Sequence, residues 1–237
     1  MAEFLLIHGS CHGAWCWRDV LPALAALGHS AHAIDLPSHG ADRTPIKDVT
    51  LDLYRDAILA AIDEAVVLVG HSMAGFPIAA AAEKAPDKIA RLVNLCTYAP
   101  YSGCSLVEMR KMAARQPLLD AIEKSEDGLS WSPIMSKARA TFYHDCPDEA
   151  VEYAKAHLTP QAILPQATKL DLGVNYARVA KSYIRCADDR TIPPEFQTEM
   201  AQRFAPEDRH ELPTSHSPFF SDPKGLAALL DKIARSG

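Results

Sequence analysis

The sequence predicts an α/β fold: a doubly wound, mostly parallel sheet with a helical cap insertion. Through the first hundred residues, short apolar runs alternate with segments that carry apolar residues at helical spacing, which is typical of βαβ units. Several of these runs are continuously apolar, as expected of strands buried on both faces. The alternation stops near residue 101 and resumes near 177. We therefore predict a single domain of 237 residues with a core of 1–100 and 177–237 and a cap insertion at about 101–176.

Strands and helices are predicted to alternate in the first part of the core. The strands are short apolar runs: Phe4–Ile7, Ser30–Ile34, Ala65–Val69 and Ile89–Cys96. The helices carry apolar residues on one face: Trp15–Leu27, the segment from Thr50 to about Asp63, and Met73–Lys84. Thr50 is a good N-cap for the second helix, and Pro86 closes the third. This alternation predicts a parallel sheet that is covered on both faces.

A helical insertion is predicted between the two parts of the core. From Pro100 to Tyr176 no run has the strength of a strand, and prolines break the helical segments. The core then resumes with two strands and two helices: Ser182–Cys186, Pro194–Phe204, Arg209–Leu212 and Asp222–Ala234. Asp222 is the expected N-cap of the last helix, with Pro223 at its first position. We expect the insertion to lie over the carboxyl ends of the strands, where open α/β sheets bind ligands, and to act as a lid.

The composition excludes several classes of partner. The net charge is −6 and no long basic run occurs, so we expect no binding to nucleic acid. No apolar stretch is long enough to span a bilayer and the N-terminus lacks a basic leader, so we expect no membrane association and a cytoplasmic location. The six cysteines are scattered singly and are expected to be reduced. We expect no metal and no cofactor. The oligomeric state stays open, with a homodimer among the states allowed.

The segment Gly70–Gly75 has the pattern of a nucleophile elbow. Ser72 lies between small residues, at the end of a β-branched run and the start of an alanine-rich helix. In such a turn the backbone is strained and the serine hydroxyl stands above the sheet edge. The usual G-x-S-x-G pattern has glycine where this chain has Ala74, so the motif alone is moderately specific. A serine that merely begins a helix is the alternative interpretation.

The C-terminal part of the chain supplies a base and an acid for this serine. A serine nucleophile needs a base, usually histidine, that is oriented by a carboxylate. In hydrolases with this elbow, the chain order is serine, acid, histidine. His216 follows the last short strand, and Asp188 and Asp189 follow the strand before it, so all lie on the same rim as Ser72. The residues alone leave the choice between the two aspartates open.

The loop after the first strand, His8–Gly13, is predicted to complete an oxyanion hole. Such a site needs N–H donors aimed at the developing negative charge. One candidate is the N–H of Met73, at the start of the elbow helix, where the helix dipole also favours negative charge. The glycines of the loop let its backbone lie against a ligand, and the N–H of Ser10 is the second candidate. His8 and His12 are interpreted as structural residues that hold the loop.

Two long motifs carry a family resemblance. The segment Leu6–Trp17 resembles the opening of the plant methylesterase and hydroxynitrile lyase group of α/β-hydrolases. Cys186–Gln197 is similar, without a gap, to the segment that holds the triad acid in that family. Together with the elbow and Ser215–Pro218, the resemblance spans nearly the whole core and constrains the insertion poorly. It implies a nucleophile, an orienting acid and a base: Ser72, Asp189 and His216.

Two positions distinguish the two chemistries of this family. The resemblance implies that lyases carry threonine at the position of Gly9 and, directly after the catalytic histidine, a lysine that stabilises departing cyanide. This chain has Gly9 and Ser217 at these two positions, which favours an esterase. We therefore predict a serine hydrolase that cleaves a small carboxylic ester through an acyl-enzyme, with that ester as its small-molecule partner. Lyase-type C–C cleavage is one alternative. The other is a catalytically weak small-molecule-binding homologue, in which Ala74 misplaces the serine.

Other side chains near these motifs have roles that the sequence leaves open. His71 is expected to pack beside the nucleophile or to line the pocket. Trp131 is expected either in the core of the cap or in the pocket wall. Three methionines of the insertion form either a soft apolar pocket or, more commonly for this residue type, part of the core: Met109, Met112 and Met135.

Overall fold

The computed structural model describes residues 1–236 and has a six-stranded sheet at its centre. The strands are β1 (Glu3–Ile7), β2 (Ser30–Ile34), β3 (Val66–His71), β4 (Ile89–Leu95), β8 (Lys181–Cys186) and β9 (Arg209–Leu212). Their order is β2-β1-β3-β4-β8-β9, and every neighbouring pair is parallel. The predicted parallel sheet is confirmed, and its strands lie where the sequence placed them, with small differences at their ends.

The chain reverses its direction of winding at β1. From β1 it moves to β2 on one side of the sheet, and it then returns to place β3 on the other side of β1. Such a switch point forms a crevice at the carboxyl ends of the strands, where ligands bind in open α/β sheets. The loop after β1 is His8–Gly13, and the turn after β3 begins at Ser72. The fold therefore brings the two predicted halves of the site to one crevice.

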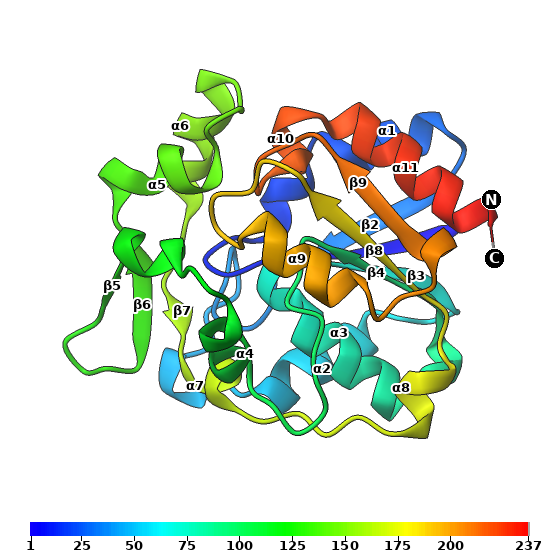
Figure 1. Cartoon of the computed structure of the whole chain (residues 1–237), viewed down its shortest axis with the longest axis horizontal. Coiled ribbons are helices and arrows are strands. Elements are labelled where there is room, and N and C mark those ends of the chain that lie inside the picture. Colours follow the sequence, from blue (N-terminus) through cyan, green and yellow to red (C-terminus); the bar gives the residue numbers. More distant parts are fainter. Residues whose placement is uncertain (237) are drawn as a thin grey trace.

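Helices cover both faces of the sheet (Figure 1). On one face, α1 (Val20–Ala26) and α11 (Pro223–Arg235) pack against one another, and the short α10 (Pro218–Ser221) leads into α11. The other face is covered by α2 (Leu51–Ala60), α3 (Gly75–Lys84), α8 (Val174–Arg178) and α9 (Pro194–Ala201). Alternate residues of β1 enter the two cores, with Leu6 on the α1 side and Leu5 on the α2 side. Among the described residues, no helix has the length and apolar character that crossing a bilayer requires.

Two predicted N-caps are confirmed. Thr50 Oγ1 accepts the backbone N–H of Leu53 at 3.0 Å, and Asp222 Oδ1 accepts that of Gly225 at 2.9 Å. Pro223 takes the first position of α11, as predicted. These side chains satisfy N–H groups that have no acceptor within the helix, which fixes where α2 and α11 begin.

Two other helices begin later than the sequence predicted. The segment Trp15–Leu27 divides into a 3-10 turn, Ala14–Trp17, and the helix α1. In the same way, α3 follows a separate 3-10 turn, Ser72–Ala74. The reason is Pro22 in α1 and Pro77 in α3. A proline ring clashes with the carbonyl four residues earlier, so each helix has its proline in the first turn.

The insertion contains a second sheet, so the prediction of a wholly helical insertion is wrong. β5 (Ile122–Lys124), β6 (Ser130–Pro133) and β7 (Gln161–Ala162) form an antiparallel sheet. The accompanying helices are α4 (Leu106–Met112), α5 (Met135–Phe142), α6 (Asp148–His157) and α7 (Leu164–Ala167). Figure 1 shows most of this segment, in green, to one side of the central sheet. The strands β5, β6 and β7 have 3, 4 and 2 residues, which is too short for an alternating pattern to be recognised.

Candidate active site

Ser72 stands on a sharp turn between β3 and α3. Its φ of 55° lies in the left-handed region, which is strained for a residue with a side chain. The flanking glycines are required by close approach: a Cβ on Gly70 would lie 2.7 Å from Ile78 Cδ1, and one on Gly75 would lie 2.3 Å from the Tyr98 carbonyl oxygen. Ala74, by contrast, is fully buried in the core beside α3. The elbow therefore accommodates its one departure from the usual pattern.

Asp189, after β8, and His216, after β9, are hydrogen-bonded to one another. His216 Nδ1 lies 2.7 Å from Asp189 Oδ2, and both side chains are buried. The carboxylate also accepts the N–H groups of Thr191 and Ile192 on Oδ1, and the side-chain amide of Gln197 on Oδ2. A carboxylate in such surroundings only accepts, so the proton of the pair resides on His216 Nδ1. Nε2 of that ring is left as an acceptor.

Asp188 lies in a different environment from its neighbour. Its side chain is 64% exposed and is hydrogen-bonded to His144 Nε2 at 2.9 Å. Of the two adjacent aspartates, the structure places only Asp189 against His216. This is the arrangement that the family resemblance implies.

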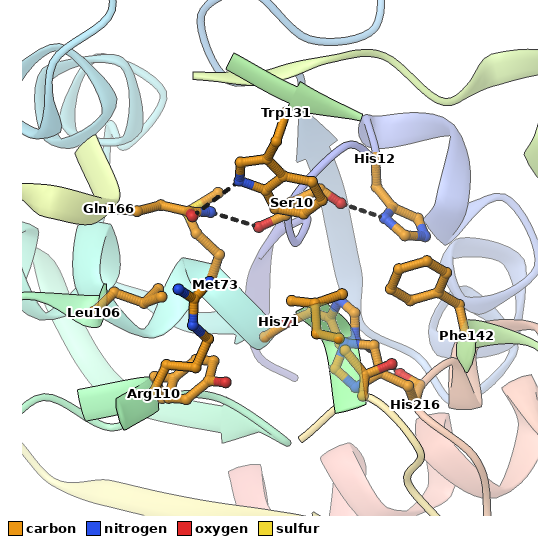
Figure 2. Close-up of a pocket in the computed structure, with 14 residues that line it drawn as sticks. Ser10, His12, His71, Met73, Leu106, Arg110, Trp131, Phe142, Gln166 and His216 are labelled. Atoms are coloured by element: carbon orange, nitrogen blue, oxygen red, sulfur yellow. Dashed lines mark hydrogen bonds between the residues drawn. The ribbon is translucent and has the colours of Figure 1, made fainter. Parts of the chain in front are cut away.

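Ser72 and His216 line one narrow cavity at the carboxyl edge of the sheet (Figure 2). The cavity has a volume of about 20 Å³, room for roughly one or two water molecules. Part of the wall comes from the insertion: Leu106, Arg110, Leu118, Trp131, Phe142 and Gln166. Within residues 1–236, Ser72 Oγ and His216 Nε2 are not hydrogen-bonded to one another. In sites without substrate such bonds are often long, and they tighten when substrate binds.

The loop His8–Gly13 lies directly against the elbow. A Cβ added to Gly9 would lie 2.9 Å from Ser72 Cβ, so glycine permits the approach. Ser10 and Met73, whose N–H groups are the predicted oxyanion donors, both line the cavity. Met73 is the second residue of the turn after β3, and N–H groups at such a start have no acceptor within the helix. The structure thus places both residues on the wall of the cavity that contains the serine.

His8 and His12 hold this loop from inside. Each donates from Nδ1 to a carbonyl oxygen of the loop: His8 to Gly9 at 2.8 Å, and His12 to Ser10 at 2.7 Å. With the proton on Nδ1, Nε2 of His12 accepts the Tyr143 hydroxyl at 2.7 Å. Both rings are buried, and their nitrogens are occupied by these contacts. This geometry agrees with the structural role predicted for them.

Burial of these histidines should make the stability of the protein depend on pH. Burial lowers the pKa of His8 to about 4 and that of His12 to about 3, from an ordinary value of 6.5. Between the folded pKa and 6.5, the unfolded chain binds protons that the folded chain does not, so acid favours unfolding. We expect the free energy of unfolding to fall by about 1.4 kcal/mol per histidine for each pH unit below about pH 6.

Urea unfolding at about pH 7, 6 and 5 measures this dependence. The variant His12→Gln separates this effect from the titration of carboxylates. Its free energy of unfolding should fall less steeply with decreasing pH than that of the wild type, and the difference in slope should correspond to about one bound proton. An unchanged slope in that variant would show that His12 is protonated equally in both states.

His71, Cys96 and His216 form a buried cluster whose potential ligand atoms lie within 4.8 Å of one another. His71 Nε2 donates to the His216 carbonyl oxygen at 2.8 Å, and His216 Nδ1 is engaged by Asp189. Burial raises the pKa of the Cys96 thiol well above its usual value, so the thiol stays protonated and is a poor metal ligand. The cluster therefore fits packing around the His216 ring better than a metal site. His71 both packs there and lines the cavity.

Trp131 and Gln166 connect the insertion to the loop after β1. Trp131 Nε1 donates to Gln166 Oε1 at 3.2 Å, and Gln166 Nε2 donates to Ser10 Oγ at 2.8 Å (Figure 2). Trp131 is buried and lines the cavity, so it belongs to the cap core and to the pocket wall at once. Met109 lies in the core, whereas Met112 and Met135 are exposed. The alternative of a methionine pocket is therefore wrong, and the prediction of core packing holds for Met109 alone.

Arg110 is the charged cavity residue that the sequence reasoning missed. It lies four residues after Leu106 in α4, and both side chains line the cavity. A spacing of four residues places two side chains on one face of a helix, so the sequence held a signal. That signal becomes specific only when the fold shows that this face of α4 meets a cavity rather than solvent.

Comparisons with known proteins agree with this geometry. A model of the Alpha/beta hydrolase family matches residues 4–229. Methylesterase 1 of Arabidopsis thaliana is 34% identical over 255 residues, which cover 98% of this chain and 95% of that protein. Esterase PIR7B of Oryza sativa subsp. japonica is 32% identical over 256 residues, covering 98% and 95%. A solved pyrethroid hydrolase from Sphingobium faniae is 27% identical with a TM-score of 0.86, covering 99% of this chain and 97% of that one. The chain therefore belongs to the alpha/beta hydrolase family, in the group that contains the plant methylesterases.

Proposed function

We propose that the protein is a serine hydrolase that cleaves small carboxylic esters through an acyl-enzyme. One observation carries the proposal: a serine on a strained elbow, Ser72, shares a cavity with His216, whose ring is hydrogen-bonded to the buried Asp189. Relatives that are named methylesterase or esterase support a carboxylic ester as the substrate class. No step of this reaction needs a metal or a cofactor.

In the first half of the reaction, Ser72 is acylated. His216 Nε2 takes the hydroxyl proton as Ser72 Oγ attacks the ester carbonyl. The bond between the carbonyl carbon and the alcohol oxygen then breaks, and His216 gives its proton to the leaving alcohol. Water repeats these steps in reverse and releases the acid. Asp189 stays ionised throughout, holds the proton on Nδ1, and stabilises the imidazolium that forms.

The N–H groups of Ser10 and Met73 are the proposed donors to the carbonyl oxygen when it becomes negative. A single donor of this kind contributes about 10²- to 10³-fold to the rate. The loop is restrained on two sides, because Gln166 donates to Ser10 Oγ and His12 donates to the Ser10 carbonyl oxygen. These two contacts support the proposal, since preorganised donors need no rearrangement when the charge develops.

Gly9 and Ser217 favour ester hydrolysis over the lyase alternative. The short approach between Gly9 and Ser72 leaves no room for the threonine that the lyases carry. Ser217 is buried and uncharged, so no cation directly follows His216. The cation of the cavity is instead Arg110, which comes from the insertion. Its position on the insertion differs from that of the lyase lysine.

A fluorophosphonate probe tests the proposed nucleophile directly. We expect stoichiometric labelling of Ser72, read by peptide mass spectrometry, and loss of methyl and p-nitrophenyl ester hydrolysis in proportion to labelling. An inert binding homologue would leave Ser72 unlabelled. A cyanohydrin cleavage assay on the same preparation addresses the other alternative. Cyanide release that is faster than the hydrolysis of every ester tried would replace the esterase proposal with a lyase.

A further inference from the structure

Arg110 places an uncompensated positive charge at the wall of the cavity. Its side chain is partly buried, and its Nε atom is buried without a hydrogen-bond acceptor. Figure 2 draws Arg110 beside Leu106 and Met73, facing the cavity. Within residues 1–236 its guanidinium has no carboxylate partner within salt-bridge distance. This Nε–H group is withdrawn from water and costs free energy until an acceptor is supplied.

The protein itself offers no anion on the cavity wall. None of the described side chains that line the cavity is an aspartate or a glutamate. The acid nearest to the reacting groups, Asp189, already accepts four hydrogen bonds and is shielded by His216. The negative charge that would pair with Arg110 must therefore enter with a ligand.

Two other arginines, the partly buried Arg91 and the exposed Arg203, show what a structural role requires. Arg91 pairs with Asp208 and donates to Ser182, and Arg203 donates to the carbonyl oxygens of Ala99 and Pro100. Each of these guanidinium groups has acceptors from the protein. Arg110 lacks them, so packing alone does not account for its position.

We propose that Arg110 binds a carboxylate on the acid part of the ester, which makes monoesters of dicarboxylic acids the preferred substrates. This inference rests on the proposed ester hydrolase and specifies its substrate class. The planar fork of guanidinium N–H groups matches the two oxygens of a carboxylate. Because relatives are named methylesterases, the alcohol part is small, and the acid part is left to carry the charge. Leu106 and Trp131 are apolar residues of the cavity wall that the carbon chain between the two ends would contact, and the cavity, with room here for roughly one or two water molecules, must widen to admit that chain.

Tyr98 adds a neutral donor on the same wall. It lines the cavity, and burial raises its pKa well above the ordinary value of 10, with the Arg110 charge acting in the opposite direction. Its hydroxyl therefore stays protonated at all pH values at which the protein would be assayed. We assign this hydroxyl as a second donor to a carboxylate bound at Arg110, because both residues line the same cavity.

Matched pairs of methyl esters test the proposal. One member is the monomethyl ester of succinate, glutarate or adipate; the other has an isopropyl group in place of the free carboxylate, which keeps the size and removes the charge. We expect the wild-type kcat/KM to favour the charged ester by about 10- to 100-fold for at least one chain length. In Arg110→Gln this ratio should fall to about one.

Two further variants separate recognition of the carboxylate from general charge. Lys111→Gln removes the same charge from the exposed neighbour in α4, outside the cavity, and should keep the wild-type ratio. Arg110→Lys keeps the charge and loses the planar fork, so its ratio should lie between those of the wild type and Arg110→Gln. A wild-type ratio near one at all three chain lengths would overturn the proposal, as would an equal change of the ratio in Lys111→Gln.

Binding separates failure of this inference from failure of the proposed function. Calorimetry with glutarate is performed on Ser72→Ala and on Ser72→Ala/Arg110→Gln, so that no turnover is needed. We expect glutarate affinity to fall at least about tenfold in the double variant. Arg110-dependent binding of glutarate without hydrolysis of any ester would refute the proposed esterase function and support the carboxylate site. Hydrolysis of the uncharged methyl esters without Arg110-dependent glutarate binding would refute the carboxylate site and support the proposed esterase function.

Discussion

Replacement of Ser72 by alanine is expected to lower kcat/KM for methyl esters by about 10⁴- to 10⁶-fold, the largest effect that we predict. Without Oγ no acyl-enzyme can form, and the residual rate comes from binding and from the oxyanion donors alone. Initial rates with the methyl esters that the wild type hydrolyses measure the loss. Circular dichroism and thermal unfolding establish that the variant is folded.

Ser38→Ala is the matched control for this substitution. Ser38 also has a left-handed backbone, with φ of 71° against 55° for Ser72, and it does not line the cavity. Both variants therefore place alanine in a strained conformation, and only one removes the proposed nucleophile. We expect Ser38→Ala to retain wild-type activity. Wild-type turnover in Ser72→Ala would contradict the acyl-enzyme mechanism.

Asp189→Asn is expected to lower kcat by about 10⁴-fold. The two Oδ1 contacts of Asp189 are backbone N–H groups, so the asparagine oxygen must face them and its NH₂ must face His216. His216 Nδ1 then has to accept rather than donate. Its proton moves to Nε2, where it can no longer receive the hydroxyl proton of Ser72.

Asp188→Asn provides the comparison, because it makes the same chemical change at the exposed neighbour. Its loss should be less than about twofold, since Asp188 is exposed, does not contact His216, and makes only a hydrogen bond with His144. The measurement is kcat for both variants, alongside thermal unfolding to show that each is folded. Equal losses of kcat in the two variants would contradict the role of Asp189 as the acid that orients His216.

Much of the core could be predicted because the signals there are local. The strand β3 is a continuous apolar run, Thr50 and Asp222 cap their helices through contacts three residues away, and parallel strands bring their carboxyl ends to one edge. The positions of Ser72 and His216 directly after strands were therefore enough to predict that both residues lie at one crevice. The choice of Asp189 over Asp188 came from a family resemblance and not from these signals.

The insertion was harder because its order depends on contacts between distant segments. The hairpin of β5 and β6 did leave a local trace: Asp127-Gly128 is a strong turn dipeptide, and Gly128 has a φ of 71°. The pairing of β6 with β7 joins residues about thirty positions apart and has no such signature. Arg110 and Gln166 meet the cavity only through this tertiary arrangement, so the helical spacing of Leu106 and Arg110 could not by itself indicate a role at the cavity.

The tight approach at Gly9 also constrains how this protein could change its chemistry over time. A Cβ there would lie 2.6 Å from His71 Nδ1 and 2.9 Å from Ser72 Cβ. Ser72 is fixed by the elbow, and the His71 ring is held in place by the His216 carbonyl oxygen. A threonine at position 9 is thus accessible only after the residue at position 71 has become smaller or has turned away. The approach to Ser72 Cβ remains even then, so the route from this site to one of the lyase type needs movement of both neighbours and not the substitution at position 9 alone.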